Sequence, residues 1–402
     1  MNEPKLRFSE FKGEWEEKTL GEECEITAGG DIPKEKISKE KTEIYKVPII
    51  SNGIGNNAIY GYTDSPKITQ AAITISARGT IGYAEYREYP YYPIVRLLSV
   101  FPKDSTSLNT KYLSYILSIQ KYDVTNAGIP QLTVPMIGSV IFHIPPSPAE
   151  QQKIASCLSA MDDLIAAQAE KVEALKEKKT GLMQQLFPQP GETTPRLRFP
   201  EFKGEWEVKN LGEVCDSILV GFPFKREDIT DDASGHPILR AFSIGEGIIR
   251  HGKDYDKYYP YDAEKLKKYE VRKGDIVISM DGSVGKNIAM VSEKEERNLL
   301  IQRVARLRIT NYPIHLIFQQ IISQRFKDYA AGEKKGAVIA HISQKQIELF
   351  PIYVPDSPAE QEKIASCLST LDDQIAAETE KLTALKDYKK GLMQQLFPQP
   401  AK

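Results

Sequence analysis

The sequence predicts an α+β protein made by tandem duplication, with two mostly-β domains and two long helices that pair as an antiparallel coiled coil. Two of the observations behind this prediction are repeats. Residues 147–190 return as residues 357–400 at a constant offset of 210, and residues 4–24 return as residues 195–215 at an offset of 191. The third observation is that the segments between the repeats are rich in short β-branched runs and differ almost completely between the halves.

These repeats divide the 402-residue chain into four parts. We expect a first domain over residues 1–146, a first long helix over 147–190, a second domain over 191–356 and a second long helix over 357–402. Because the offset grows from 191 to 210 between the repeats, the second domain carries 19 more residues than the first. Domain followed by helix, twice over, indicates a duplicated unit.

Each repeated helical segment carries its own start and stop signals. Ser147 supplies an N-cap, Pro148 suits the first turn and Glu150 completes a capping box, and the second copy repeats all three. A Phe-Pro step closes each copy, because proline cannot continue a helix. We therefore predict two uninterrupted helices.

Apolar residues along both helices follow the alternating steps of three and four that define a heptad seam. Polar residues interrupt the seams at Gln168, Lys179, Glu378 and Lys389. An antiparallel pairing that sets Lys179 against Glu378, and Gln168 against Lys389, leaves every other layer apolar, whereas a slip of one heptad sets each lysine against an apolar residue. Buried polar residues often fix register, so we predict the first arrangement. The alternative is two separate helices, each packed on its own domain.

Composition and charge narrow the class of protein. The sequence has no run of 18 apolar residues, its start MNEPKLRFSE is too polar for a signal peptide, and its four cysteines form no C-x-x-C motif. We therefore expect a cytoplasmic protein without a structural zinc or a disulfide framework. A net charge of −2 argues mildly against a non-specific nucleic-acid binder, which needs many Lys and Arg contacts to phosphate.

Within the domains, short apolar runs bounded by turn residues predict strands, and two stretches have helical periodicity. We expect Trp15 and Trp206, at equivalent places in the opening repeats, to seal the core of each domain. ISARGTIG (75–82) parallels ISMDGSVG (278–285), and residues 129–145 parallel residues 339–355, so the frame is shared while the loop chemistry differs. The expected strands lie within 46–50, 71–76, 94–101, 139–145, 236–243, 274–279, 303–309 and 349–355, and the expected helices within 110–122 and 314–329.

The proline-capped SPAEQQKIA and SPAEQEKIA starts, the LMQQLFP helix ends and the EFKGEW opening of each half resemble the specificity subunits of type I restriction–modification systems. The resemblance covers essentially the whole chain. It implies that each domain is a target recognition domain reading one half of a split, asymmetric site in double-stranded DNA. It also implies that the helices space the half-sites and dock two modification subunits that carry S-adenosylmethionine and methylate adenine. Restriction subunits, for which ATP and Mg²⁺ are expected, then join to cut unmethylated DNA.

The residues themselves predict no catalytic, cofactor or metal site. GSVGKN (282–287) lacks the first glycine and the Ser/Thr of a phosphate loop. Asp262, Glu264 and Lys265 come nearest to a nuclease cluster, but their charged run is typical of a solvated helix face. Two alternatives stay open: a coiled-coil scaffold that does not bind DNA and holds two copies of a partner, and a self-contained enzyme, against which the missing motifs weigh.

Bases are read by Arg, Lys, Gln, Asn or His on short exposed loops, and glycine permits close approach to phosphate. These residue types gather in the turns after predicted strands. The candidates for DNA contact are Asn52, Arg78, Thr80 and Gln131 in the first domain, and Asp281, Ser283, Lys286, Lys334, Lys335, His341 and Gln344 in the second.

Overall fold

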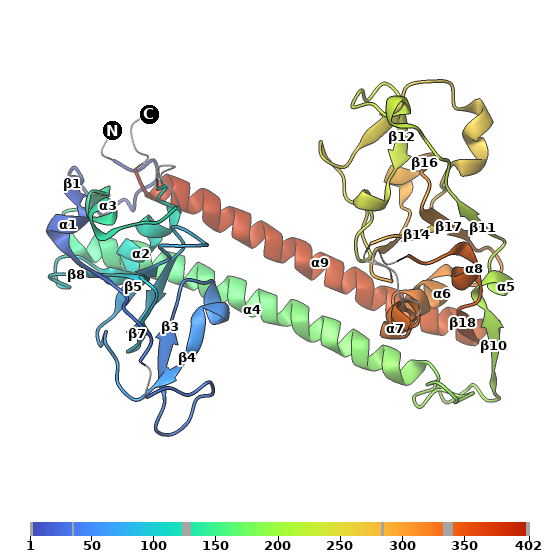
Figure 1. The fold of residues 1–402 in the computed structure, drawn as a ribbon, viewed down its shortest axis with the longest axis horizontal. Coiled ribbons are helices and arrows are strands. Elements are labelled where there is room, and N and C mark those ends of the chain that lie inside the picture. The colour runs from blue at the N-terminus through green and yellow to red at the C-terminus, as the bar shows by residue number, and fades with distance from the viewer. Residues whose placement is uncertain (1–2, 34–35, 123–129, 283–284, 333–340, 399–402) are drawn as a thin grey trace. The chain divides into compact units, whose positions relative to one another are not determined.

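The computed structural model describes residues 3–33, 36–122, 130–282, 285–332 and 341–398. The chain forms two compact units (Figure 1). Unit 1 comprises residues 1–170 and 380–402, and unit 2 comprises residues 171–379. Each unit therefore contains one domain, the first part of the long helix that follows it, and the last part of the long helix from the other half.

Unit 1 has two main sheets and a separate strand pair. The four-stranded sheet is antiparallel in the order β2-β8-β5-β6, the three-stranded sheet has the order β4-β3-β7, and β1 pairs with β9. Its strands are β1 (Glu16–Thr19), β2 (Cys24–Ala28), β3 (Val47–Ile50), β4 (Ile59–Thr63), β5 (Ala72–Ile75), β6 (Ala84–Arg87), β7 (Tyr92–Pro93), β8 (Leu98–Pro102) and β9 (Ile141–Ile144). Its shorter helices are α1 (Leu20–Glu23), η1 (Gly55–Ala58), α2 (Thr110–Ile119) and α3 (Val134–Gly138).

Unit 2 repeats this plan strand for strand. Its sheets have the orders β11-β17-β14-β15 and β13-β12-β16, and β10 pairs with β18. Its strands are β10 (Trp206–Asn210), β11 (Ser217–Val220), β12 (His236–Leu239), β13 (Lys257–Tyr259), β14 (Ile276–Ser279), β15 (Ile288–Met290), β16 (Leu299–Leu300), β17 (Val304–Arg308) and β18 (Pro351–Pro355). Its shorter helices are α5 (Leu211–Val214), η2 (Arg226–Asp228), η3 (Ala241–Ser243), η4 (Glu264–Tyr269), η5 (Glu293–Glu295), α6 (Ile314–Ile321), α7 (Gln324–Gly332) and α8 (Gln344–Glu348).

The duplicated α+β fold is confirmed, and each expected strand segment contains a strand. The single helix expected over 314–329 is wrong, because the chain breaks after Ile321 into α6 and α7. Ile321 and Phe326 enter the same core although a continuous helix would turn them about 140° apart, so the break serves packing.

Both tryptophans close a core, as predicted. Trp15 is 2% exposed and meets Tyr112 edge-on in unit 1, while Trp206 is 3% exposed and meets Phe187 edge-on in unit 2. The opening repeat thus supplies the largest apolar side chain of each junction between domain and helix.

The long helices are α4 (Pro148–Leu186) and α9 (Pro358–Leu396), each of 39 residues. Within each unit the segments of α4 and α9 run antiparallel. In unit 2 Leu182 packs into a cluster with Ile364 and Leu368, and in unit 1 Ile154 shares a cluster with Leu396. The seam predicted from the heptad spacing therefore holds in both units.

The predicted register is wrong by one heptad. It sets Leu182 opposite Ile375, whereas Leu182 packs against the cluster that contains Leu368. Lys179 pairs with Asp372 instead of Glu378, which pairs with Lys171. Lys389 likewise pairs with Asp162 rather than facing Gln168, a buried residue. A lysine can pack its methylene groups against apolar residues of the seam while its ammonium binds an aspartate at the edge of the seam. A lysine opposite an apolar residue is therefore tolerated.

Those two aspartates explain why this register is preferred. Asp372 also accepts a hydrogen bond from Gln319 of α6 (2.5 Å), and Asp162 accepts one from the Tyr115 hydroxyl of α2 (2.8 Å). Each aspartate therefore connects the long helix that carries it to a short helix of the domain in the same unit and to a lysine of the other long helix. Register is therefore set by contacts to the domains as well as by the seam.

The capping-box glutamates have a different role from the one expected. Arg7 donates Nε and Nη2 to the two oxygens of Glu150, both at 2.8 Å, and Arg198 does the same to Glu360. Glu150 is 0% and Glu360 1% exposed. The opening repeat thus clamps the first turn of the helix in its own half by a bidentate ion pair.

Candidate nucleic-acid interface

The glycine turn after β5 presents Arg78, the best-placed candidate of the first domain. Its side chain is exposed, and Gln131 Oε1 accepts from Arg78 Nε (2.9 Å) and Nη2 (2.6 Å). A backbone bond from Leu132 N to Ala77 O brings the two segments together. The structure therefore unites two predicted residues that are 53 positions apart.

Asn52 belongs to the same cluster but holds the backbone. Its Nδ2 donates to Val95 O (2.7 Å), and its Oδ1 accepts from the N–H groups of Ala77 (2.7 Å) and Arg78 (3.3 Å). Because the amide is used in this way, Asn52 positions the turn. Thr80, the fourth candidate, lies exposed in the turn itself.

The second domain has the same backbone arrangement at this place but different polar side chains. Ile342 N donates to Met280 O as Leu132 N does to Ala77 O, so Asp281 takes the place of Arg78 and His341 takes that of Gln131. Asp281 Oδ1 lies 2.6 Å from His341 Nδ1. An arginine–glutamine pair in one domain is thus an aspartate–histidine pair in the other.

Arg303 completes the second cluster. Its Nη1 donates to Asp281 Oδ2 at 2.5 Å, and its side chain is 65% exposed. Partial burial tends to raise the pKa of Asp281, but the hydrogen bonds from Arg303 and His341 outweigh burial and lower it. The carboxylate is therefore ionised and neutralised by its neighbour.

Arg303 and its counterpart Arg96 were missed by sequence reasoning. In the sheets Ile75 pairs with Leu98 and Ile278 with Ala305, so Arg96 and Arg303 occupy equivalent positions two residues before these partners. Both have left-handed backbone, with φ of 60° and 65°, and both are exposed. The signal was a shared Ile-x-Arg, which opens the segment predicted as a strand over 94–101 and ends at the first residue of the one predicted over 303–309. Both observed strands begin only after the arginine.

The remaining candidates for DNA contact in the second domain are one exposed residue, one structural residue and three residues that the structure does not describe. Lys286 is exposed beside Gly285, whose φ is +80° and where a Cβ would lie 3.1 Å from the Lys327 Cα. Gln344 donates to Ile218 O and to Glu348, which ties α8 to the sheet and makes it structural. Ser283, Lys334 and Lys335 lie outside the described residues.

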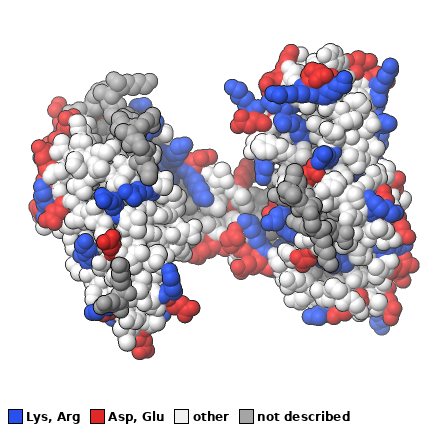
Figure 2. Space-filling model, viewed as in Figure 1, with Lys and Arg blue, Asp and Glu red and all other residues white. Residues whose placement is uncertain are grey.

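Figure 2 shows how charged side chains are distributed over one face of the molecule. On the face shown in Figure 2, Lys and Arg side chains are interspersed with Asp and Glu in both units. This agrees with the net charge of −2. On this face, positive charge occurs in local clusters rather than in a continuous basic field.

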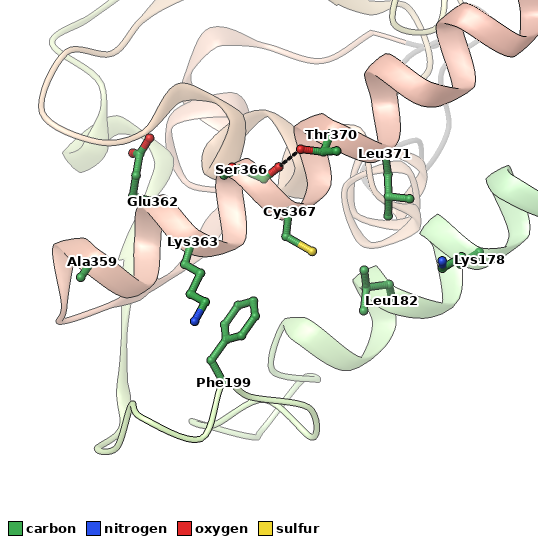
Figure 3. Close-up of a pocket in the computed structure, with 10 residues that line it drawn as sticks. All are labelled: Lys178, Leu182, Phe199, Ala359, Glu362, Lys363, Ser366, Cys367, Thr370 and Leu371. Atoms are coloured by element: carbon green, nitrogen blue, oxygen red, sulfur yellow. Dashed lines mark hydrogen bonds between the residues drawn. The ribbon is translucent and has the colours of Figure 1, made fainter.

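A second surface feature lies on the helices of unit 2. A hollow of about 770 Å³, named here the helix hollow, opens between α4, α9 and the opening repeat (Figure 3). Lys363 lies over the Phe199 ring at 4.5 Å, and Cys367 is half-buried. The lining residues are Lys178, Leu182, Phe199, Ala359, Glu362, Lys363, Ser366, Cys367, Thr370 and Leu371.

Metal clusters, membrane-spanning helices and disulfides are absent from the described residues. Across the described ranges no three His, Cys, Asp or Glu side chains are grouped as metal ligands. No helix in the described part of the chain is long and apolar enough to cross a membrane. All four cysteines, each in a described segment, are free thiols.

Two matched domains that carry different exposed polar clusters, each tied to long antiparallel helices, define a duplicated binding protein. The family model for the type I restriction modification DNA specificity domain matches residues 12–177 and 203–387. The chain belongs to that family.

Relatives and solved structures agree with this placement. The putative type I restriction enzyme MjaX specificity subunit of Methanocaldococcus jannaschii is 26% identical over 98% of this chain and 96% of its own length. The putative type I specificity subunit S.MpnORF507P of Mycoplasma pneumoniae is 36% identical, but that match spans 34% of this chain and 36% of the relative. The type I restriction-modification S subunit from M. genitalium has a similar fold, with a TM-score of 0.63 at 17% identity, over 99% of this chain and 100% of that one.

Proposed function

We propose that this chain is the DNA specificity subunit of a type I restriction–modification complex, in which each domain reads one half of a bipartite, asymmetric site. The observation that carries the proposal is the exchange of Arg78–Gln131 for Asp281–His341 at equivalent positions. A shared frame with different polar groups at one place is what two different half-sequences require.

The proposal assigns catalysis to partners. Two modification subunits would bring S-adenosylmethionine and methylate adenine, and restriction subunits using ATP and Mg²⁺ would cut DNA. The long helices would fix the distance between half-sites and dock the modification subunits.

The duplicated helices suit two copies of one partner. The helix hollow is lined by α9 residues whose counterparts on α4 lie 210 positions earlier, including Ser366 for Ser156 and Thr370 for Ala160. Ser366 and Thr370 are exposed, so a large side chain there fills the hollow without entering the core. We expect Thr370→Arg to remove one modification subunit, Ala160→Arg to remove one, and the double variant to remove both, as measured by native mass spectrometry. Full occupancy in the double variant would refute the docking site.

The reading function is tested on the assembled complex. Sequencing of methylated adenines in cells carrying the complex should reveal one bipartite motif. Arg78→Ala should change the preference in one half-site and Lys286→Ala should weaken binding, measured as the affinity for a duplex carrying the motif. If neither variant changes affinity or half-site preference, the glycine turns do not read DNA.

A further inference from the structure

Arg303 stands at a strained place on the second domain. Its φ of 65° is a conformation that favours glycine and strains the backbone of a residue with a side chain. Its carbonyl accepts the Met280 N–H (2.9 Å), and the next residue, Val304, is fully buried at the start of β17. The backbone is therefore fixed from both sides while the guanidinium projects outward.

Asp281 is arranged to orient that guanidinium and is poorly placed to read a base itself. One carboxylate oxygen accepts from Arg303 and the other faces His341, so both oxygens already contact protein. A guanidinium has five N–H donors, and the bond to Asp281 takes one of them. The remaining donors include pairs that match O6 and N7 of guanine in the major groove, the commonest specific contact of arginine.

The first domain also holds an exposed arginine by a hydrogen bond to a neighbouring acceptor, but at a different position in the fold. There Arg78, on the glycine turn, is the arginine held by a neighbouring acceptor, Gln131 Oε1. In the second domain the glycine-turn position holds the acceptor, Asp281, and the oriented arginine is Arg303. The second domain thus holds its oriented arginine at the position that Arg96 occupies in the first domain, and the first domain holds Arg78 on its glycine turn.

We propose that Arg303 reads a guanine in the half-site of the second domain, with Asp281 as its positioning residue. Arg78 reads a guanine in the other half-site from a different slot. The inference rests on the proposed DNA specificity function and names its base-reading groups. It predicts guanine at non-equivalent places in the two half-sites, which makes the whole site asymmetric.

The test uses the complex with its modification subunits and a pool of randomised DNA duplexes, with bound duplexes sequenced. The wild type should select a bipartite motif. Arg303→Ala should lose one guanine in the second half-site, keep the first half-site, and bind the wild-type motif roughly 5- to 150-fold more weakly. Arg303→Lys should retain part of the affinity without the guanine preference, because an ammonium lacks the bidentate fork.

Two further variants separate reading from folding. Arg303→Gly relieves the backbone and should lose the same guanine as Arg303→Ala, so the loss is not a folding defect. Asp281→Asn should weaken the same preference and no other. Arg78→Ala is the matched control and should affect the first half-site alone.

The outcomes are distinct. If the wild type selects a motif and both Arg303→Ala and Arg303→Gly select it unchanged, or bind all duplexes equally more weakly, the inference is overturned while the proposed function stands. If the wild type selects no motif, the proposed function itself fails.

Discussion

Arg96 occupies a backbone conformation that suits glycine better than arginine. At φ 60° a Cβ crowds the following carbonyl, so Arg96→Gly should raise the stability of unit 1 by about 1 kcal/mol while weakening DNA binding by the complex. Arg96→Ala is the control, since it removes the same guanidinium but keeps the strain. Calorimetric melting of both variants decides the matter: equal melting temperatures would show that strain at this position is absent.

Asn52 illustrates how a residue of base-reading type can be structural. Ala77, whose N–H it accepts, is 0% exposed, so Asn52→Ala leaves a buried donor unsatisfied at a cost of about 1–3 kcal/mol. Asn52→Asp keeps this acceptor but sets a carboxylate oxygen against Val95 O, where Asn52 Nδ2 donates at 2.7 Å, so it should also destabilise unit 1 through repulsion between the two oxygens. Urea unfolding measures both. A stable Asn52→Ala protein with altered base preference would instead make Asn52 a reader.

Among the elements, the register of α4 against α9 is the sharpest test. Lys179 is 12% exposed and Asp372 37%, so water screens the pair and Lys179→Glu should cost about 1 kcal/mol. Adding Asp372→Lys should recover much of this, because the new ammonium can also meet Gln319 Oε1, a buried atom that has no hydrogen-bond partner among the described residues. Adding Glu378→Lys instead should recover nothing. Rescue by Glu378→Lys alone would restore the register predicted from the seam.

The elements that sequence predicted well are those fixed by local physics. Proline, serine and heptad spacing define α4 and α9, and β-branched runs define the strands. The register could not be predicted because Asp162 and Asp372 take their partners from α2 and α6, which are distant in sequence. Arg78 and Asp281 could be chosen as candidates from the sequence because each precedes a glycine in an equivalent turn. Arg96 and Arg303 were missed because left-handed backbone at a non-glycine residue is imposed by tertiary pairing.

At the scale of the whole molecule, duplication separates what must stay the same from what must differ. The clamps Arg7–Glu150 and Arg198–Glu360, the tryptophans and the aspartate junctions recur in both units. The residues after β5 and β14 do not. The proposed function needs this division, because docking of two copies of one partner would depend on the repeated surface and reading of two half-sequences would depend on a few exposed side chains.

The repeated clamps also predict how the units unfold. Arg198→Ala leaves the carboxylate of Glu360, 1% exposed, without its cation, which should destabilise unit 2 by about 3–5 kcal/mol. Hydrogen exchange should then rise across β10, β18 and the first turns of α9, and Arg7→Ala should produce the matching rise in unit 1. Arg198→Met with Glu360→Leu removes both charges and should restore most of the protection. If Arg198→Ala raised exchange equally in both units, the two halves would unfold as one cooperative body, and the independence that lets each domain diverge would be lost.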